Sequence, residues 1–195
     1  ERLAILLPNR AEVALAFLGA LKAGVVVVPL NWRLQGADLG RLVAHCTPAC
    51  VLTDTARAGE FDGSTSRAML TVGEAAHEGS FWDLIAGQDG DFGAIPCQAN
   101  EVANLLYTSG TTSTPKAAIH THGMRVAIAG AMADCFKLSA RDVGLAVSPM
   151  FHTSGLSVFS NAIFAGCTLV LLDRWDLEEF LDAIERERVT FMHVI

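Results

Sequence analysis

The first 28 residues constrain the fold more than any other part of the chain. They hold an apolar stretch at residues 3–7, a helix-forming run at 11–23 with apolar side chains three or four positions apart, and then four valines, Val25 to Val28. Gly24 separates this run from the valines, as is typical of the residue that follows a helix. A run of four valines is typical of a strand buried on both faces. These residues therefore predict a strand, a helix and a second strand.

The same alternation of strand and helix continues to the end of the chain. We expect helices over residues 37–45, 81–86, 124–136 and 158–164, and a further one that Asp176 caps. Strands are expected over residues 49–53, 102–107, 118–120, 143–147 and 168–172. Residues 55–80 are mixed in character and rich in Gly, Ser and Thr, and we expect them to contain surface loops. The alternation predicts an α/β fold with largely parallel sheets and flanking helices.

Composition and charge restrict the class of protein. The chain has 195 residues, of which 51% are hydrophobic and 18% charged, and this suffices for a sizeable buried core. A formal charge of -7 argues against general nucleic-acid binding, which needs a basic surface. No apolar run reaches the ~18 residues that a membrane helix requires, so we expect no integral membrane segment.

The cysteines suggest where the protein works. Five are present, scattered along the chain and without a C-x-x-C pair. An odd number without such spacing predicts neither a disulfide framework nor a zinc site. We expect small buried side chains in a reducing compartment, and therefore a cytoplasmic protein.

Both ends of the chain have the character of interrupted structure. The sequence opens directly on an apolar strand candidate and stops within the apolar run "VTFMHVI". We therefore expect residues 1–195 to be an incomplete domain of a larger protein. If such a piece folds alone, exposed apolar surface at its edges favours self-association.

One segment, "YTSGTTSTPK" at residues 107–116, differs from the rest of the chain. It follows an expected strand, and in open α/β sheets ligands bind at that end of the strands. Small residues allow the backbone to approach a ligand, and successive N–H groups form a nest that suits an anion. Hydroxyl groups can bind phosphate oxygens or magnesium, and Lys116 adds a positive charge. The segment predicts a site for the terminal phosphates of a nucleotide.

Two alternatives compete with this interpretation. The Walker loop, G-x-x-x-x-G-K-[ST], serves the same purpose, but counted from Gly110 the chain has Pro115 in place of the second glycine. Ala117 stands where that motif needs a hydroxyl. The other alternative is a Ser/Thr-rich loop that binds no ligand, although such loops seldom end in Pro-Lys before an apolar strand.

At this point the sequence shows a family resemblance. The segment closely resembles the signature Y-T-S-G-T-T-G-x-P-K-G of the adenylate-forming enzymes, which include acyl-CoA synthetases, firefly luciferase and peptide-synthetase adenylation domains. "SPMFHTSGL" resembles the P-x-F-H-x-x-G segment of that family. The N-terminal strand–helix–strand and "DLEEFLDAIERERVTFMHVI" also resemble it, so the likeness covers essentially the whole chain.

The resemblance implies an activity. In this family ATP and a carboxylic acid react to an acyl-adenylate and pyrophosphate, and the acyl group then passes to a thiol, usually that of coenzyme A. The chain would be part of the large N-terminal domain, without the small C-terminal domain, and the fragment alone is expected to be inactive. The implied cofactors are ATP, Mg²⁺ and coenzyme A, and the partner is a small-molecule carboxylic acid.

The resemblance also implies roles for individual residues. His152 matches a position between the acyl pocket and the ATP site, and Thr108 matches one that helps to hold magnesium. The residues expected around the β- and γ-phosphates are Thr108, Ser109, Gly110, Thr111, Thr112 and Lys116.

The chain departs from the signature at two positions. Ser113 and Ala117 stand where the family usually has glycine, and a serine forced to a positive φ would strain the backbone by ~1 kcal/mol or more. These departures leave open a non-catalytic binding or interaction module that keeps the fold. A peptide-synthetase adenylation domain is a further alternative. His120 and His122 lie two apart without a third ligand in sight, so we interpret them as structural.

Overall fold

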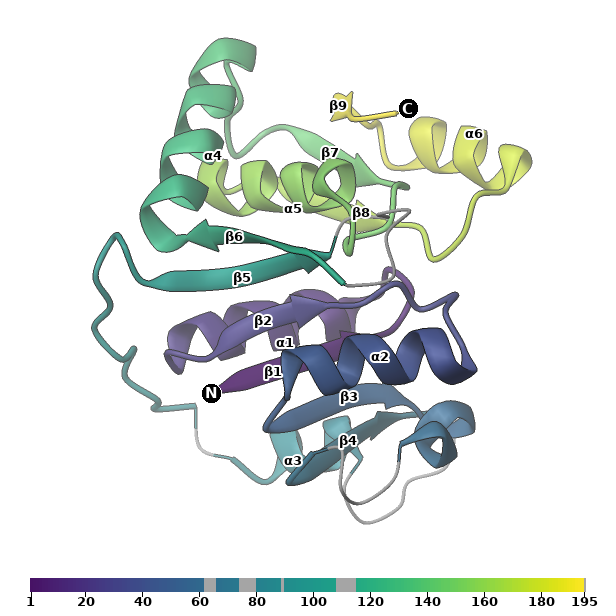
Figure 1. Cartoon of the computed structure of the whole chain (residues 1–195). Helices are drawn as coiled ribbons and strands as arrows, with labels where there is room; N and C mark the ends of the chain where they lie inside the picture. The colour runs from purple at the N-terminus through teal and green to yellow at the C-terminus, as the bar shows by residue number, and fades with distance from the viewer. Residues whose placement is uncertain (62–65, 74–79, 89, 108–114, 195) are drawn as a thin grey trace.

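The computed structural model describes residues 1–61, 66–73, 80–88, 90–107 and 115–194 (Figure 1). The helices are α1 (Ala11–Lys22), α2 (Gly36–Cys46), the 3-10 helix η1 (Thr55–Glu60), α3 (Phe81–Ala86), α4 (His122–Phe136), α5 (Thr153–Ala165) and α6 (Leu177–Arg186). The strands are β1 (Arg2–Leu6), β2 (Val26–Pro29), β3 (Cys50–Asp54), β4 (Ala68–Val72), β5 (Val102–Tyr107), β6 (Ala117–Thr121), β7 (Val143–Ala146), β8 (Thr168–Leu171) and β9 (Phe191–Met192).

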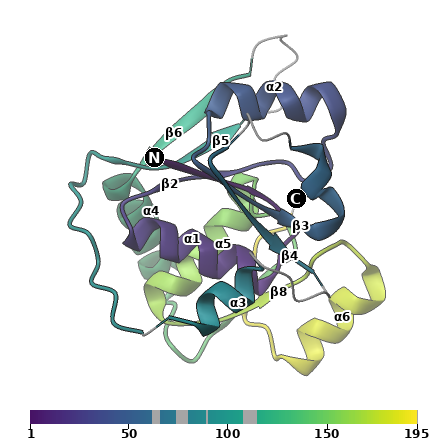
Figure 2. The same ribbon diagram turned by 90° about the horizontal axis from the view of Figure 1, so that it is seen from below.

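The strands form two sheets. The larger has the order β4-β3-β1-β2-β5-β6, in which only the β5–β6 pair is antiparallel. The smaller sheet has the order β8-β7-β9 and is parallel throughout. Helix α2 lies on one face of the larger sheet, and α1 and α5 lie on the opposite face (Figure 2). The predicted α/β fold with largely parallel sheets and flanking helices is confirmed.

The valine run occupies the position that its composition predicts. Val27 pairs with Leu3 and Val28 with Ala4 of β1, and both valines are fully buried. Val27 packs into the hydrophobic cluster on the α1 side of the sheet, while Val28 packs into the cluster on the α2 side. Both faces of β2 are thus covered, which explains why the strand shows no alternation of polar and apolar residues.

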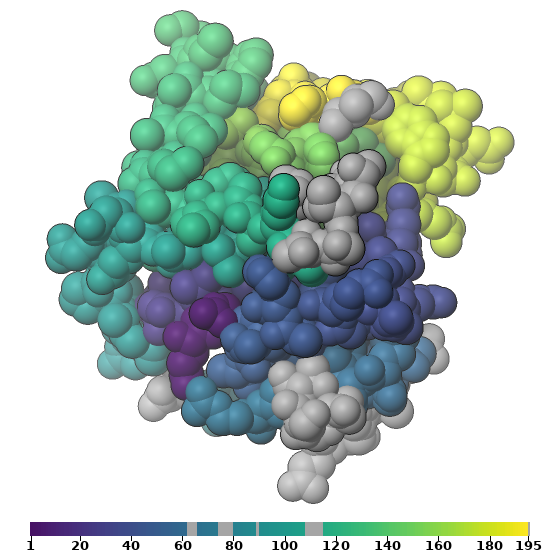
Figure 3. Space-filling model, in the orientation of Figure 1, coloured from purple at the N-terminus to yellow at the C-terminus, as the bar shows by residue number. Residues whose placement is uncertain are grey.

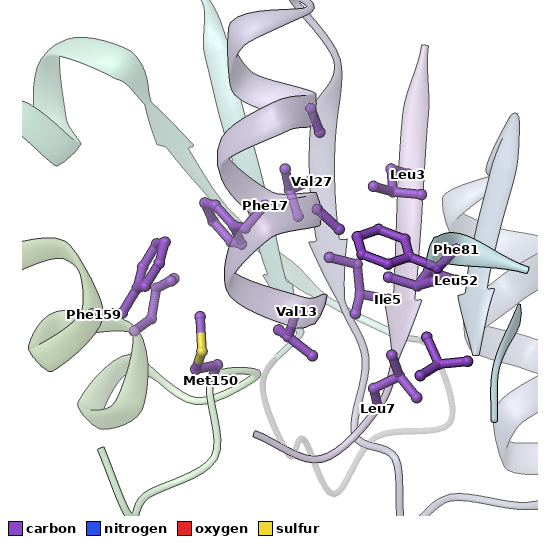
Figure 4. Packing of buried hydrophobic residues seen from close by; sticks show 14 of the residues in the cluster. Leu3, Ile5, Leu7, Val13, Phe17, Val27, Leu52, Phe81, Met150 and Phe159 are labelled. Carbon is purple, nitrogen blue, oxygen red and sulfur yellow. The ribbon is translucent and has the colours of Figure 1, made fainter. Parts of the chain in front are cut away.

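Helix α1 connects the two halves of the structure. Its Phe17 is 2% exposed and meets Phe159 of α5 edge to face, with ring centroids 5.3 Å apart and an interplanar angle of 63°. The buried stripe of α1 that includes Phe17 also packs against β1 and β2, and Met150 belongs to the same cluster (Figure 4). One hydrophobic core therefore extends from the larger sheet through α1 to α5.

Two local details differ from the sequence prediction. Residues 55–80, expected to contain surface loops, also contain η1 and the strand β4, which pairs in parallel with β3. The sequence of β4, AMLTV, is apolar at four of five positions, but this short run is flanked by residues rich in Gly, Ser and Thr. Helix α5 begins at Thr153 and not at 158, because its polar first turn is stabilised by a cap that apolar periodicity does not register.

The cysteines correct another expectation. Cys46 is buried, but Cys97 and Cys135 are exposed, so these two are not the small buried residues that we expected. The predicted cap of α6 is confirmed, since the Asp176 carboxylate accepts a hydrogen bond of 3.0 Å from the N–H of Glu179. No helix within the described ranges is long and apolar enough to cross a membrane.

Truncation of Phe17 tests the connecting role of α1. Phe17→Ala should lower the free energy of unfolding by about 3–5 kcal/mol, because it removes a buried aromatic side chain and leaves a cavity between α1 and α5. Leu15 lies on the same helix but is 46% exposed, so Leu15→Ala should stay within about 0.5 kcal/mol of wild type. Chemical denaturation measures both, and equal effects would contradict this assignment.

Candidate functional site

The predicted phosphate-binding segment joins two paired strands. Strand β5 ends at Tyr107, β6 begins at Ala117, and these two residues face each other in the antiparallel register. Lys116 is exposed and directly precedes β6. The other predicted positions lie outside the described residues: Thr108, Ser109, Gly110, Thr111 and Thr112.

The topology places this segment at the carboxyl edge of the larger sheet. Because β5 is parallel to β2, and β2 to β1, the segment leaves the sheet at the edge where β1 continues into Pro8-Asn9. This is the edge at which open α/β sheets bind ligands. Ala117 lies in regular extended strand, where no glycine is required, so this departure from the signature causes no strain. Ser113 lies outside the described residues.

Asn9 fixes the next segment that reaches this region. Its side chain is 4% exposed, and Nδ2 donates to the carbonyl oxygens of Ala146 at 3.1 Å and Ser148 at 2.9 Å. Oδ1 accepts a bond of 2.8 Å from the N–H of Met150. One buried amide therefore holds the backbone that leads from β7 to His152, and ties it to the turn after β1.

His152 is the N-cap of α5. Its Nδ1 accepts a hydrogen bond of 3.4 Å from the N–H of Ser154 and lies 2.9 Å from the Ser154 hydroxyl. Because Nδ1 acts as acceptor, the neutral ring carries its proton on Nε2. His152 is exposed, so this N–H is available to a ligand. Sequence reasoning predicted the residue but not its capping role.

Gly155 allows the first turn of α5 to lie against the preceding segment. A Cβ at this position would stand 2.2 Å from the carbonyl oxygen of Ser148 and 2.5 Å from that of Pro149. Both contacts are with backbone, which cannot turn away as a flexible side chain could. The glycine is therefore required by close packing of the helix start on residues 148–149.

His120 has a structural partner. Its Nδ1 lies 3.3 Å from Nδ2 of Asn104, the fully buried residue opposite it on β5. Burial lowers the pKa of His120, and the charge of Arg125 lowers it further. Arg125 itself donates to the carbonyl oxygen of Leu156 at 3.2 Å and to the Ser160 hydroxyl, which fastens α4 to α5. Among the described residues, no group of three or more His, Cys, Asp or Glu could hold a metal ion.

Comparison with known proteins identifies the family. The model of the family described as "AMP-binding enzyme" matches residues 1–195. The chain therefore belongs to this family of adenylate-forming enzymes, as its signature segment indicates.

Individual proteins similar to this chain also belong to the class of CoA ligases or resemble the chain in structure. The chain is 34% identical over 206 residues to a 2-succinylbenzoate–CoA ligase of Geobacillus kaustophilus, covering 98% of this chain and 37% of that protein. It is 29% identical to the long-chain-fatty-acid–CoA ligase FadD13 of Mycobacterium tuberculosis, covering 97% and 38%. The crystal structure of ATP-bound MatB from Rhodopseudomonas palustris superposes with a TM-score of 0.85 at 27% identity, covering 95% and 38%. The chain thus spans well under half the length of these relatives.

Sequence reasoning missed two residues that shape this region. Asn9 follows Pro8 directly after the apolar stretch at residues 3–7, and an asparagine in such a tight connection often bonds to backbone groups. Arg125 lies in an Ala-rich helix, and its partners on α5 are distant in sequence. Only the first had a local signal that could have found it.

Asn9 can be tested through the backbone groups that it satisfies. Asn9→Ala leaves the N–H of Met150 and two carbonyl oxygens without this partner, and should lower the free energy of unfolding by about 2–4 kcal/mol. Asn31 accepts a bond from the N–H of Arg33 in an exposed turn, so Asn31→Ala should cost less than about 1 kcal/mol. Urea denaturation of both variants checks this, and a loss below 1 kcal/mol for Asn9→Ala would refute the assignment.

Gly155 and Gly40 form a matched pair of helical glycines. Gly155→Ala should lower the free energy of unfolding by about 2–3 kcal/mol, because the added methyl group overlaps fixed backbone. Nothing lies within 4 Å of a Cβ at Gly40, so Gly40→Ala should raise it by up to about 1 kcal/mol. Thermal and chemical unfolding should show opposite signs, and a neutral Gly155→Ala would show that the close packing is not needed.

Proposed function

We propose that the enzyme to which this chain belongs activates a carboxylic acid with ATP and transfers the acyl group to coenzyme A. The observation that carries the proposal is the segment 107–116, rich in hydroxyl groups and ending in Lys116, at the carboxyl edge of a parallel sheet. Family membership over the whole chain and the CoA ligases among its relatives support it.

We assign the residues as follows. The cofactor-binding residues, around the β- and γ-phosphates of ATP, are Thr108, Ser109, Gly110, Thr111, Thr112 and Lys116. Magnesium, which Thr108 would help to hold, supplies additional positive charge to the phosphates. His152 would face the reacting carboxylate, with its Nε2 N–H as hydrogen-bond donor.

The chemistry proceeds in two displacements. A carboxylate oxygen attacks the α-phosphorus of ATP, a C–O–P linkage forms, and the bond to pyrophosphate breaks. The ammonium group of Lys116 stabilises the negative charge that develops on this leaving group. In the second displacement the thiolate of coenzyme A attacks the acyl carbon, and AMP departs with the electron pair of the broken C–O bond.

The alternative of a non-catalytic module depends on the departures from the signature. Ala117 no longer supports it, because the strand at this position accepts alanine without strain. Of the two departures, Ser113 still supports it. A peptide-synthetase role differs in the acceptor, which would be a carrier-protein thiol in place of coenzyme A.

Lys116 provides the direct test. In the complete enzyme, Lys116→Ala should reduce acid-dependent exchange of pyrophosphate into ATP by roughly 100-fold, since it removes a charge that faces the leaving group. Lys22, at the end of α1, lies at the opposite edge of the sheet, and Lys22→Ala should leave the exchange unchanged. The assay uses a panel of aliphatic and aromatic acids. Lack of exchange with every acid, or equal rates in both variants, would count against the proposal.

A further inference from the structure

The side chain of Tyr107, the first residue of the phosphate-binding segment, is held by a different element of the fold. The hydroxyl group of Tyr107, at the end of β5, shares a hydrogen bond of 2.7 Å with Nδ1 of His45. The two rings also meet edge to face, with centroids 5.6 Å apart and an interplanar angle of 79°. His45 lies in the last turn of α2, so this pair joins that helix to the strand end at which the segment begins.

The end of α2 that carries His45 is itself fixed. Arg2 of β1 donates to the carbonyl oxygen of Cys46 at 2.7 Å and also to the Thr47 hydroxyl. Cys46 is 1% exposed, and the N–H of Thr47 closes the helix on the carbonyl oxygen of Val43 at 2.9 Å. The imidazole of His45, which is exposed, therefore extends from a helix end that is held in place. Residues of the α2 range form part of the molecular surface (Figure 3).

Tyr107 needs such a support. Tyr107 and Ala117 form the last pair of the β5–β6 ladder. Because β6 is the edge strand of its sheet, it has a neighbouring strand on the β5 side only. The ring packs against the cluster between α2 and the sheet, and burial raises the pKa of Tyr107 to about 12, which keeps the phenol neutral. The hydroxyl group thus keeps its proton and takes part in the 2.7 Å hydrogen bond with His45.

We propose that His45 is a positioning residue for nucleotide binding, which acts by holding the Tyr107 hydroxyl and so fixing the base from which residues 108–116 start. This inference rests on the proposed function of that segment. His45 belongs to no signature motif and lies 62 residues before its partner, so only the fold brings the two together. The bond lowers the cost of binding by keeping the segment's two ends, Tyr107 and Ala117, in one arrangement.

Amide hydrogen exchange tests the positioning without relying on activity. In the complete protein, His45→Ala and Tyr107→Phe should each accelerate exchange about three- to tenfold in peptides that cover residues 105–107 and 117–119, because one hydrogen bond no longer opposes opening of the strand pair. Peptides from β1 and β7 should be unchanged. His45→Gln, whose amide can still bond to the phenol, should be closer to wild type. Unchanged exchange at both strand ends in both variants would overturn the inference, whether or not the protein is active.

Steady-state kinetics then distinguishes a positioning role of His45 in ATP binding from a general loss of enzyme activity. In pyrophosphate exchange, His45→Ala and Tyr107→Phe should each raise the KM for ATP about three- to tenfold and leave the KM for the acid unchanged. The double variant should be no worse than either single one, because both remove the same bond. Ala44→Ser, an exposed change on the same helix, is the control and should match wild type.

The two proposals fail in different ways. If the wild-type enzyme shows no exchange with any acid, the proposed function is overturned, and hydrogen exchange alone decides whether His45 fixes the strand end. If the wild type is active and both single variants keep its KM for ATP, the positioning role is wrong while the proposed function stands.

Discussion

The rest of the structure depends on the burial of α1 between two layers. Its buried residues, Phe17 among them, pack in one hydrophobic cluster with β1 and β2 on one hand and with Phe159 of α5 on the other. This cluster is the main apolar contact between the larger sheet and the part of the chain that includes α5 and the segment from Ser148 to His152. The nearby hydrogen bonds of Asn9 are directional but few, so they can set the register of that segment only after hydrophobic packing has brought the layers together.

The sequence predicted those elements whose signal is local. The valine run, Gly24 and the Asp176 cap each identify a structure by the chemistry of neighbouring residues, and all three predictions hold. Strand β4 was not predicted, although its sequence AMLTV is apolar at four of five positions, because the Gly-, Ser- and Thr-rich residues around it are typical of loops. The candidate site likewise contains residues with a local sequence signal and residues whose contacts depend on tertiary packing. The signature segment and His152 stand out in the sequence, whereas the contacts of Asn9 and of His45 join residues that only tertiary packing brings together.

The candidate site combines a rigid frame with a polar segment. Tyr107 and Ala117 terminate two hydrogen-bonded strands, and the helix α5 starts on backbone that Gly155 allows to approach closely. Catalytic and binding groups placed at the ends of such elements need little reorganisation when a ligand arrives, which lowers the entropic cost of binding. The structural residues around the site therefore contribute to function through geometry and not through contact with substrate.

The charge of the chain indicates that the groups of the candidate site would act on a nucleotide only at short range. The formal charge of these 195 residues is -7, so their net charge does not favour the approach of a polyanionic nucleotide from a distance. Salt would in any case screen charges more than about 10 Å away. Under the proposed function, binding would therefore depend on groups in direct reach of the phosphates, namely backbone N–H groups, hydroxyls, Lys116 and a bound cation. Because each of these acts only at short range, a displacement of the segment by about 1 Å would weaken several of them at once, which is why the anchoring of its first residue matters.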